Sequence, residues 1–173
     1  MAESTALTHD TTSHVVSRPR VVLDTNVCLD LFVFLGPRHE ALSAALKIGE
    51  YTAVTREDCR AEWLAVLEYS QLALVAERRA QARDAFDAYV TCLAPSALSG
   101  RPEVRLPRCT DPDDQKFLEL AWEAGAVALL TRDKALLRLR RRATRDGLFT
   151  IATPDAWSND VITGCLSAPL TSS

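Results

Sequence analysis

Residues 21–31 read V-V-L-D-T-N-V-C-L-D-L, and this stretch decides the fold. Val21, Val22 and Leu23 form a continuous apolar run, which is typical of a strand buried on both faces of a sheet. The run ends at Asp24, so a carboxylate follows the strand directly. The stretch therefore predicts a central strand of an α/β fold, with Asp24 at its carboxyl end.

Helical and strand signals alternate from this stretch onward, which is the pattern of βα units laid into a parallel sheet with helices on both faces. Further strands are expected at 51–54, 104–106, 127–130 and 149–152. Helices are expected at 42–49, from a Thr55 and Asp58 capping box to about residue 93 with a break, from 110–114 to Gly125, and at 134–144, with a loop at 94–102. We divide the chain into a tail at 1–19, a globular domain at 20–160 and a second tail at 161–173.

Composition narrows the class of protein. With 47% hydrophobic and 25% charged residues, the chain has the make-up of a globular protein and not of a fibre or a disordered chain. It contains neither an apolar run long enough for a membrane span nor a secretory signal, so we expect a cytoplasmic protein without membrane contact. The cysteines are odd in number and never form a C-x-x-C pair, which argues against a zinc site or a disulfide framework.

Two carboxylates follow buried strands. Asp24 comes after the first strand, and Asp133 follows the strand expected at 127–130. The carboxyl ends of parallel strands are where ligands bind in open sheets, so both side chains are expected to face one crevice. For each Asp taken alone, the favoured interpretation is that it begins a turn or caps a helix, and two in equivalent positions reduce the weight of that interpretation.

Other acids are candidates for the same crevice. Asp114 precedes Phe117, Leu118 and Ala121 at helical spacing, which places it on the apolar face of its helix. With Asp111 as N-cap, Asp114 also suits the helix dipole, so capping and catalysis are equally compatible with this segment. Glu62 could project toward the sheet edge or be an ordinary solvated glutamate.

Clustered carboxylates repel one another unless a cation neutralises them, and hard cations such as Mg²⁺ and Mn²⁺ prefer oxygen ligands. Such a cation activates water for in-line attack on a phosphodiester and stabilises charge on the leaving oxygen. The acids therefore indicate hydrolysis of a phosphodiester bond.

The segments VVLDTNVCLDL, CRAEWLAVL, DPDDQKFLELAWEAGA and LLTRDKALL occur in this order and resemble the successive motifs of PIN-domain proteins, especially the toxins of toxin–antitoxin pairs. The resemblance covers residues 20–157. It implies a three-layer α/β/α sandwich around a parallel sheet and a metal-dependent endoribonuclease. It also implies an RNA substrate, a small antitoxin protein as partner and a homodimer.

Carried over by position, the resemblance implies that acids hold Mg²⁺ or Mn²⁺ and perform catalysis. The catalytic acids would be Asp24, Glu62, Asp114 and Asp133, with Asp111 as a fifth metal ligand. Asn26 and Thr131 would orient these carboxylates through hydrogen bonds. Many relatives have Gly where Arg132 stands and an acid where Gln115 stands, and neither change removes a ligand.

The net charge of −3 provides no general attraction for nucleic acid, so RNA would have to be held by a local basic patch and by metal. The arginines that could contact RNA are Arg132, Arg138, Arg141 and Arg142. The alternative is that this basic run is only a solvated helix face.

Two other functions are alternatives to a metal-dependent nuclease. A phosphohydrolase with Asp24 as nucleophile would need D-x-D at the first strand, where this chain has D-T-N. A PIN-like module that binds RNA or protein without cutting remains the alternative, but binding alone gives no reason to gather mutually repelling carboxylates.

Overall fold

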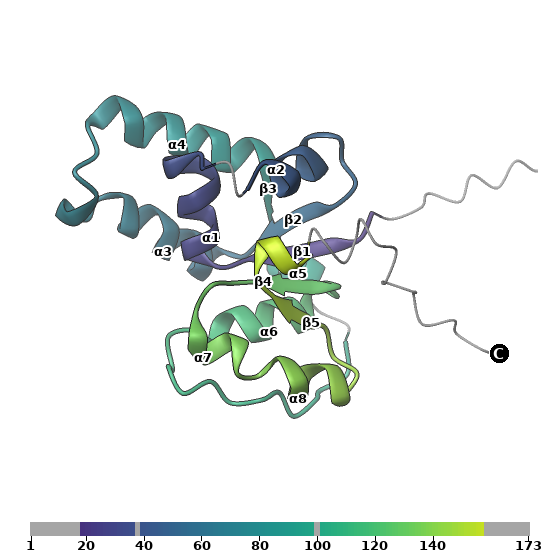
Figure 1. The fold of residues 1–173 in the computed structure, drawn as a ribbon. Coiled ribbons are helices and arrows are strands. Elements are labelled where there is room, and N and C mark those ends of the chain that lie inside the picture. Colours follow the sequence, from purple (N-terminus) through teal and green to yellow (C-terminus); the bar gives the residue numbers. More distant parts are fainter. Residues whose placement is uncertain (1–17, 37–38, 99–100, 158–173) are drawn as a thin grey trace, which may run out of the picture.

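The computed structural model describes residues 18–36, 39–98 and 101–157, and in them one parallel sheet runs through the molecule (Figure 1). Its strands are β1 (Arg20–Leu23), β2 (Thr52–Thr55), β3 (Val90–Cys92), β4 (Ala128–Leu130) and β5 (Thr150–Ala152), in the order β3-β2-β1-β4-β5. The tails expected at 1–19 and 161–173 lie outside the described residues, apart from Arg18 and Pro19.

Helices cover both faces of the sheet. The first group is α1 (Thr25–Leu29), the π-helix η1 (Asp30–Phe34), α2 (Glu40–Lys47), α3 (Glu57–Leu67), the 3₁₀ helix η3 (Ser70–Leu72) and α4 (Ala76–Tyr89). The second group is α5 (Pro95–Leu98), α6 (Gln115–Glu123), α7 (Lys134–Leu137) and α8 (Arg140–Arg145). Figure 1 shows α1 to α4 on one side of the sheet and α6 to α8 on the other, which confirms the predicted α/β/α sandwich.

The alternation of side chains along β1 explains the two layers. Val21 and Leu23 pack into a core with α1 to α4, whereas Val22 points to the opposite face and packs into a core with α6 to α8. On the first face Trp63 stacks on Phe86 with 5.2 Å between ring centroids, and Phe32 meets both rings edge-on. A strand buried on both faces needs apolar residues at consecutive positions, as the sequence predicted.

The strand order creates a switch point beside β1. The chain proceeds outward from β1 to β2 and β3, and then crosses back to place β4 on the other side of β1. The chain segments that follow β1 and β4 therefore leave the sheet in opposite directions at the carboxyl ends of these two strands. This switch point is where open parallel sheets bind ligands, and both Asp24 and Asp133 follow the strands that form it.

The structure corrects the prediction for residues 55–106. Thr55 belongs to β2 and pairs with Cys92, so it forms no capping box, and α3 begins at Glu57. The helical stretch ends at Tyr89, because residues 90–92 pair with β2 as the third strand. Residues 104–106 form no strand, and the loop expected at 94–102 contains the short helix α5.

Two further helix boundaries differ from the prediction. The helix expected from 110–114 begins at Gln115 with Asp114, not Asp111, in the N-cap position. Asp111 instead accepts a hydrogen bond from the backbone N–H of Asp113 at 3.0 Å, which closes a turn before the helix. The basic helix expected at 134–144 is divided into α7 and α8 by a turn at 138–139.

Candidate active site

Asp24 lies at the carboxyl end of β1, where the strand passes into α1. Its backbone N–H donates to the carbonyl oxygen of Leu130 at 3.0 Å, which extends the pairing of β1 with β4 by one residue. The residue is only 3% exposed, so its carboxylate needs partners within the protein. Oδ2 accepts from the hydroxyl of Thr131 at 2.5 Å and from the amide Nδ2 of Asn26 at 2.6 Å.

The pKa of Asp24 is raised above its usual value, and burial is the largest cause. Hydrogen bonds from Thr131 and Asn26 act in the opposite direction, while the negative charge of Glu62 raises the pKa further. Asp24 is therefore a carboxylate held in place by donors but short of positive charge.

Asp133 is joined to Asp24 through Thr131. The buried Thr131 hydroxyl donates to Asp24 and accepts from the backbone N–H of Asp133 at 2.9 Å. Asp133 then begins α7, since its Oδ1 accepts from the backbone N–H groups of Ala135 at 2.5 Å and Leu136 at 3.4 Å. Its other oxygen, Oδ2, has no hydrogen-bond partner among the described residues. Asp133 thus caps a helix with one oxygen and leaves the other available.

Asn26 ties the two strand ends together from the other direction. While Nδ2 donates to Asp24, Oδ1 accepts from the backbone N–H of Arg132 at 3.1 Å. The D-T-N segment after β1 and the T-R-D segment after β4 are therefore cross-linked twice, through Thr131 and through Asn26. Both links fix the position of the Asp24 carboxylate.

Asp114 lies at the start of α6 and is repelled by the other acids of the candidate site. It occupies the N-cap position, but its side chain accepts no capping hydrogen bond. Its pKa is raised to about 6, first by partial burial and then by repulsion from Asp24, Asp133, Asp111 and Glu62. Asp114 therefore does not cap α6 through its side chain. The repulsion also places these five acids in one common electrostatic field.

Glu62 reaches the same region from α3. The hydroxyl of Thr25 donates to Oε1 at 2.6 Å, and Lys116 forms an ion pair with Oε2. Sequence reasoning missed both partners. Thr25 lies within the D-T-N segment, so its position beside the acids could have been found there. Lys116 could not, because it comes two residues after Asp114, and side chains two residues apart on a helix do not face each other.

The donor set suits a hard divalent cation, although the side chains are not drawn together around one point. Within 18–36, 39–98 and 101–157, no three His, Cys, Asp or Glu side chains are arranged to hold one metal ion. Glu62 is turned to Lys116, and Asp133 is turned to the N-terminus of α7. The chemistry nevertheless fits, because the donors are carboxylate oxygens, which hard divalent cations prefer. Burial first, and then the charges of four other acids, raise the pKa of Asp114, and a bound cation would offset both effects.

The arginines named from the sequence have different surroundings. Arg132 forms ion pairs through Nε with Asp30 at 2.8 Å and through an NH2 nitrogen with Asp155 at 3.4 Å, so its charge is compensated. Arg142 pairs with Asp146 at 3.6 Å. Arg138 and Arg141 line an open cavity beside α7 and α8 and have no acidic partner in the described chain.

A family model described as PIN domain matches residues 20–135, which is more than half of the chain, and the match contains Asp24, Glu62, Asp111, Asp114 and Asp133. The chain therefore belongs to the PIN-domain family. Proteins of this family are generally nucleases. The comparison with curated proteins gave no significant match. Among the helices of the described residues, none has the length and hydropathy needed to cross a membrane.

The raised pKa of Asp114 predicts how stability depends on pH without metal. In the folded state the carboxyl holds its proton up to about pH 6, whereas the unfolded chain releases it near its usual value. The folded state therefore binds more protons between these values, and the free energy of unfolding should fall as the pH rises from about 4 to 6 and then level off. Thermal unfolding in EDTA across this range measures the slope.

Asp114→Asn should flatten that slope, since an amide does not titrate. Asp113→Asn is the matched control, because Asp113 is exposed and its side chain forms no hydrogen bond or ion pair with a described residue. An equal slope in the wild type and in Asp114→Asn would show that Asp114 is not repelled by its neighbours.

Proposed function

We propose that this chain is a divalent-metal-dependent endoribonuclease that hydrolyses RNA phosphodiester bonds. The observation that carries the proposal is the raised pKa of Asp114, which results from burial and from the charges of Asp24, Asp133, Asp111 and Glu62. An assembly of carboxylates that repel one another is stabilised by a cation, and without one it destabilises the folded protein. Membership of a family that consists mostly of nucleases supports the same conclusion.

In this proposal Asp24, Glu62, Asp114 and Asp133 act in catalysis, and together with Asp111 they hold Mg²⁺ or Mn²⁺. A cation bound there supplies positive charge that activates water and stabilises the negative charge developing on the phosphate. Thr131 and Asn26 keep the Asp24 carboxylate in one orientation, and Lys116 neutralises Glu62 when the cation is absent. Asp114, whose pKa lies at about 6, can take up a proton near neutral pH under the same conditions.

We further propose a biological setting: the toxin of a toxin–antitoxin pair, acting in the cytoplasm, inhibited by a small antitoxin protein and assembled as a homodimer. The support for this part of the proposal is the resemblance of the four motifs to those of PIN-domain toxins.

The proposal is tested by incubating the purified protein with a mixed pool of single-stranded and structured RNAs in Mg²⁺, in Mn²⁺ and in EDTA. We expect RNA fragments with either metal and none in EDTA. If no RNA is cut, and calorimetry detects no Mn²⁺ binding, the protein is not a metal-dependent nuclease, and a module that binds without cutting becomes the better account.

A further inference from the structure

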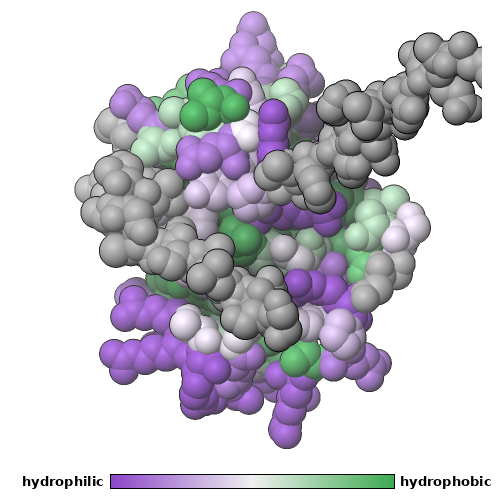
Figure 2. Space-filling model, turned by 90° about the vertical axis from the view of Figure 1, so that its right-hand side faces the viewer, coloured by the Kyte–Doolittle hydropathy of each residue, from purple (hydrophilic) through white to green (hydrophobic). Residues whose placement is uncertain are grey.

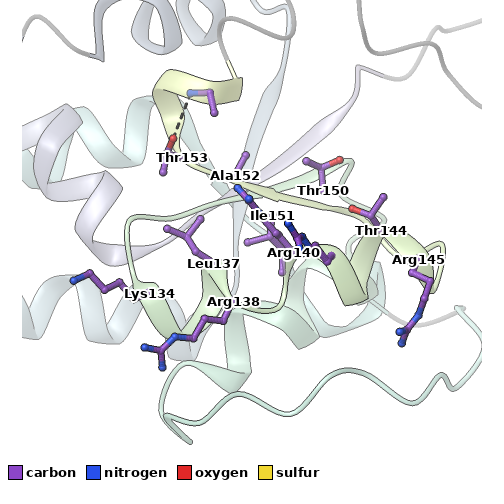
Figure 3. Close-up of a pocket in the computed structure, with 12 residues that line it drawn as sticks. Lys134, Leu137, Arg138, Arg140, Thr144, Arg145, Thr150, Ile151, Ala152 and Thr153 are labelled. Atoms are coloured by element: carbon purple, nitrogen blue, oxygen red, sulfur yellow. Dashed lines mark hydrogen bonds between the residues drawn. The ribbon is translucent and has the colours of Figure 1, made fainter.

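A cavity with a basic lining begins next to Asp133 and contains none of the acids of the candidate site. An open cavity of about 980 Å³ is bounded by α7, α8 and the outer strand β5 (Figure 3). Its lining includes the basic residues Lys134, Arg138, Arg140, Arg141 and Arg145. None of the described residues that line it is acidic. For a chain with a net charge of −3, this is a pronounced local excess of positive charge.

Most of this charge is not compensated within the protein. The side chains of Lys134, Arg138, Arg140 and Arg141 are exposed and form no ion pair or hydrogen bond with any described residue. Arg145, which shares Asp146 with Arg142, is the exception. Figure 3 shows Lys134 of α7 and Arg138 of the turn after it at one end of the cavity, and Arg145 at the other. In Figure 2, long hydrophilic side chains extend from the lower end of the molecule, at the level of α8 in Figure 1.

The remainder of the lining favours phosphate over bases as the bound group. Thr144, Thr150 and Thr153 contribute hydroxyls, which can donate to phosphate oxygens. No aromatic ring is present among the lining residues, so the cavity has no platform on which a base could stack. Its floor consists of small and aliphatic residues such as Leu137, Ile151 and Ala152.

The cavity begins close to the acids along the chain and in the sheet. Lys134 follows Asp133 directly, and β5 lies beside β4, whose end carries Thr131 and Asp133. A nucleic acid strand has one negative charge per nucleotide and would be repelled by five clustered carboxylates. Uncompensated cations in a cavity that begins at Lys134, next to Asp133, would offset that repulsion.

We infer that this cavity binds the backbone phosphates of the RNA strand that is cut at the acids, through Lys134, Arg138, Arg140 and Arg141. The inference rests on the proposed ribonuclease function and specifies where its substrate lies. Contacts made only to phosphates carry no base information, so the cavity contributes affinity without sequence preference. Arg132 and Arg142, which are already paired with acids, are not part of this surface.

The test measures RNA binding separately from cleavage. Fluorescence anisotropy of a labelled single-stranded RNA of mixed sequence is recorded in EDTA, over a range of salt concentrations, for the wild type and for Arg138→Gln/Arg141→Gln. The control is Lys47→Gln/Arg83→Gln, which removes the same charge from two exposed side chains that contact no described acid and lie outside the cavity. A poly-glutamate peptide is the competing probe.

For Arg138→Gln/Arg141→Gln we expect affinity to fall by about tenfold and the dependence of log K on log salt to become shallower by roughly 1.4, since each phosphate contact on a single strand contributes about 0.7. The control variant should bind as the wild type does. In Mn²⁺, the cavity variant should raise KM for RNA cleavage and leave kcat unchanged.

Equal RNA binding by the wild type and the cavity variant would overturn the inference, even if both proteins cut RNA. Absence of RNA binding by the wild type, with tight binding of poly-glutamate, would overturn it in favour of an acidic protein partner. A third outcome separates the two proposals. If the wild type binds RNA but does not cut it in Mn²⁺, and Arg138→Gln/Arg141→Gln binds RNA more weakly, the proposed catalysis is refuted and phosphate binding by the cavity is supported.

Discussion

Asp24→Asn should reduce RNA cleavage in Mn²⁺ by on the order of a thousandfold, the size of effect seen when one preorganised electrostatic group is removed from an active site. The side chain is buried where β1 ends and accepts hydrogen bonds from Thr131 and Asn26. An amide oxygen can accept the same two hydrogen bonds, so the site should keep its arrangement while it loses a negative charge. The measurement is the initial rate of fragment formation from a labelled RNA.

The stability of this variant separates loss of chemistry from loss of folding. The pKa of Asp24 is raised mainly by burial, which means that its charge destabilises the folded state at neutral pH. Asp24→Asn should therefore unfold at the same temperature as the wild type or at a higher one. Asp84→Asn, an exposed change on α4, serves as the control for both measurements. Cleavage at the wild-type rate by Asp24→Asn would remove this carboxylate from the mechanism.

Mn²⁺ should raise the melting temperature of the wild type by about 6–10 °C at a concentration one hundred times its dissociation constant. Binding at that level adds about 2.7 kcal/mol to the free energy of unfolding, and a chain of this size gains roughly 2–4 °C per kcal/mol. The physical reason is that the cation offsets the effects that raise the pKa of Asp114 to about 6, which are partial burial first and then repulsion from the neighbouring acids. EDTA should reverse the shift.

The same experiment identifies the ligands. Asp114→Asn should lose most of the Mn²⁺-dependent shift, because it removes a carboxylate oxygen that the cation would bind. Asp113→Asn should retain the whole shift, since Asp113 is exposed and is not among the acids whose charges raise the pKa of Asp114. A shift of equal size in wild type and Asp114→Asn would place the cation elsewhere on the protein.

Several features of this protein follow from local sequence alone. A continuous apolar run such as Val21 to Leu23 can be satisfied only where both faces of a strand are covered, so the sandwich could be inferred from one stretch. The position of Asp24 and Asp133 after their strands follows from the same pattern, because parallel strands end at one edge of a sheet. These inferences need only the hydrophobic pattern along each strand and the direction in which the chain runs.

Other features depended on contacts between segments distant in sequence. Residues 90–92 became a strand because β2 offered an unpaired edge, although the residues before them are helical. Whether Asp114 caps its helix was undecided from its spacing, and the carboxylates contributed by other elements determined its environment.

What the sequence determined by itself was therefore the layered fold, the strand ends and the acids that follow them, since hydrophobic period is a local property. Only the tertiary structure decided which charges are compensated: Arg132 and Arg142 are paired with acids, whereas Arg138 and Arg141 are free of described partners. It also brought Lys116 to Glu62 and Thr131 to Asp24. Electrostatic interactions depend on distance in space, and for these pairs the fold sets that distance.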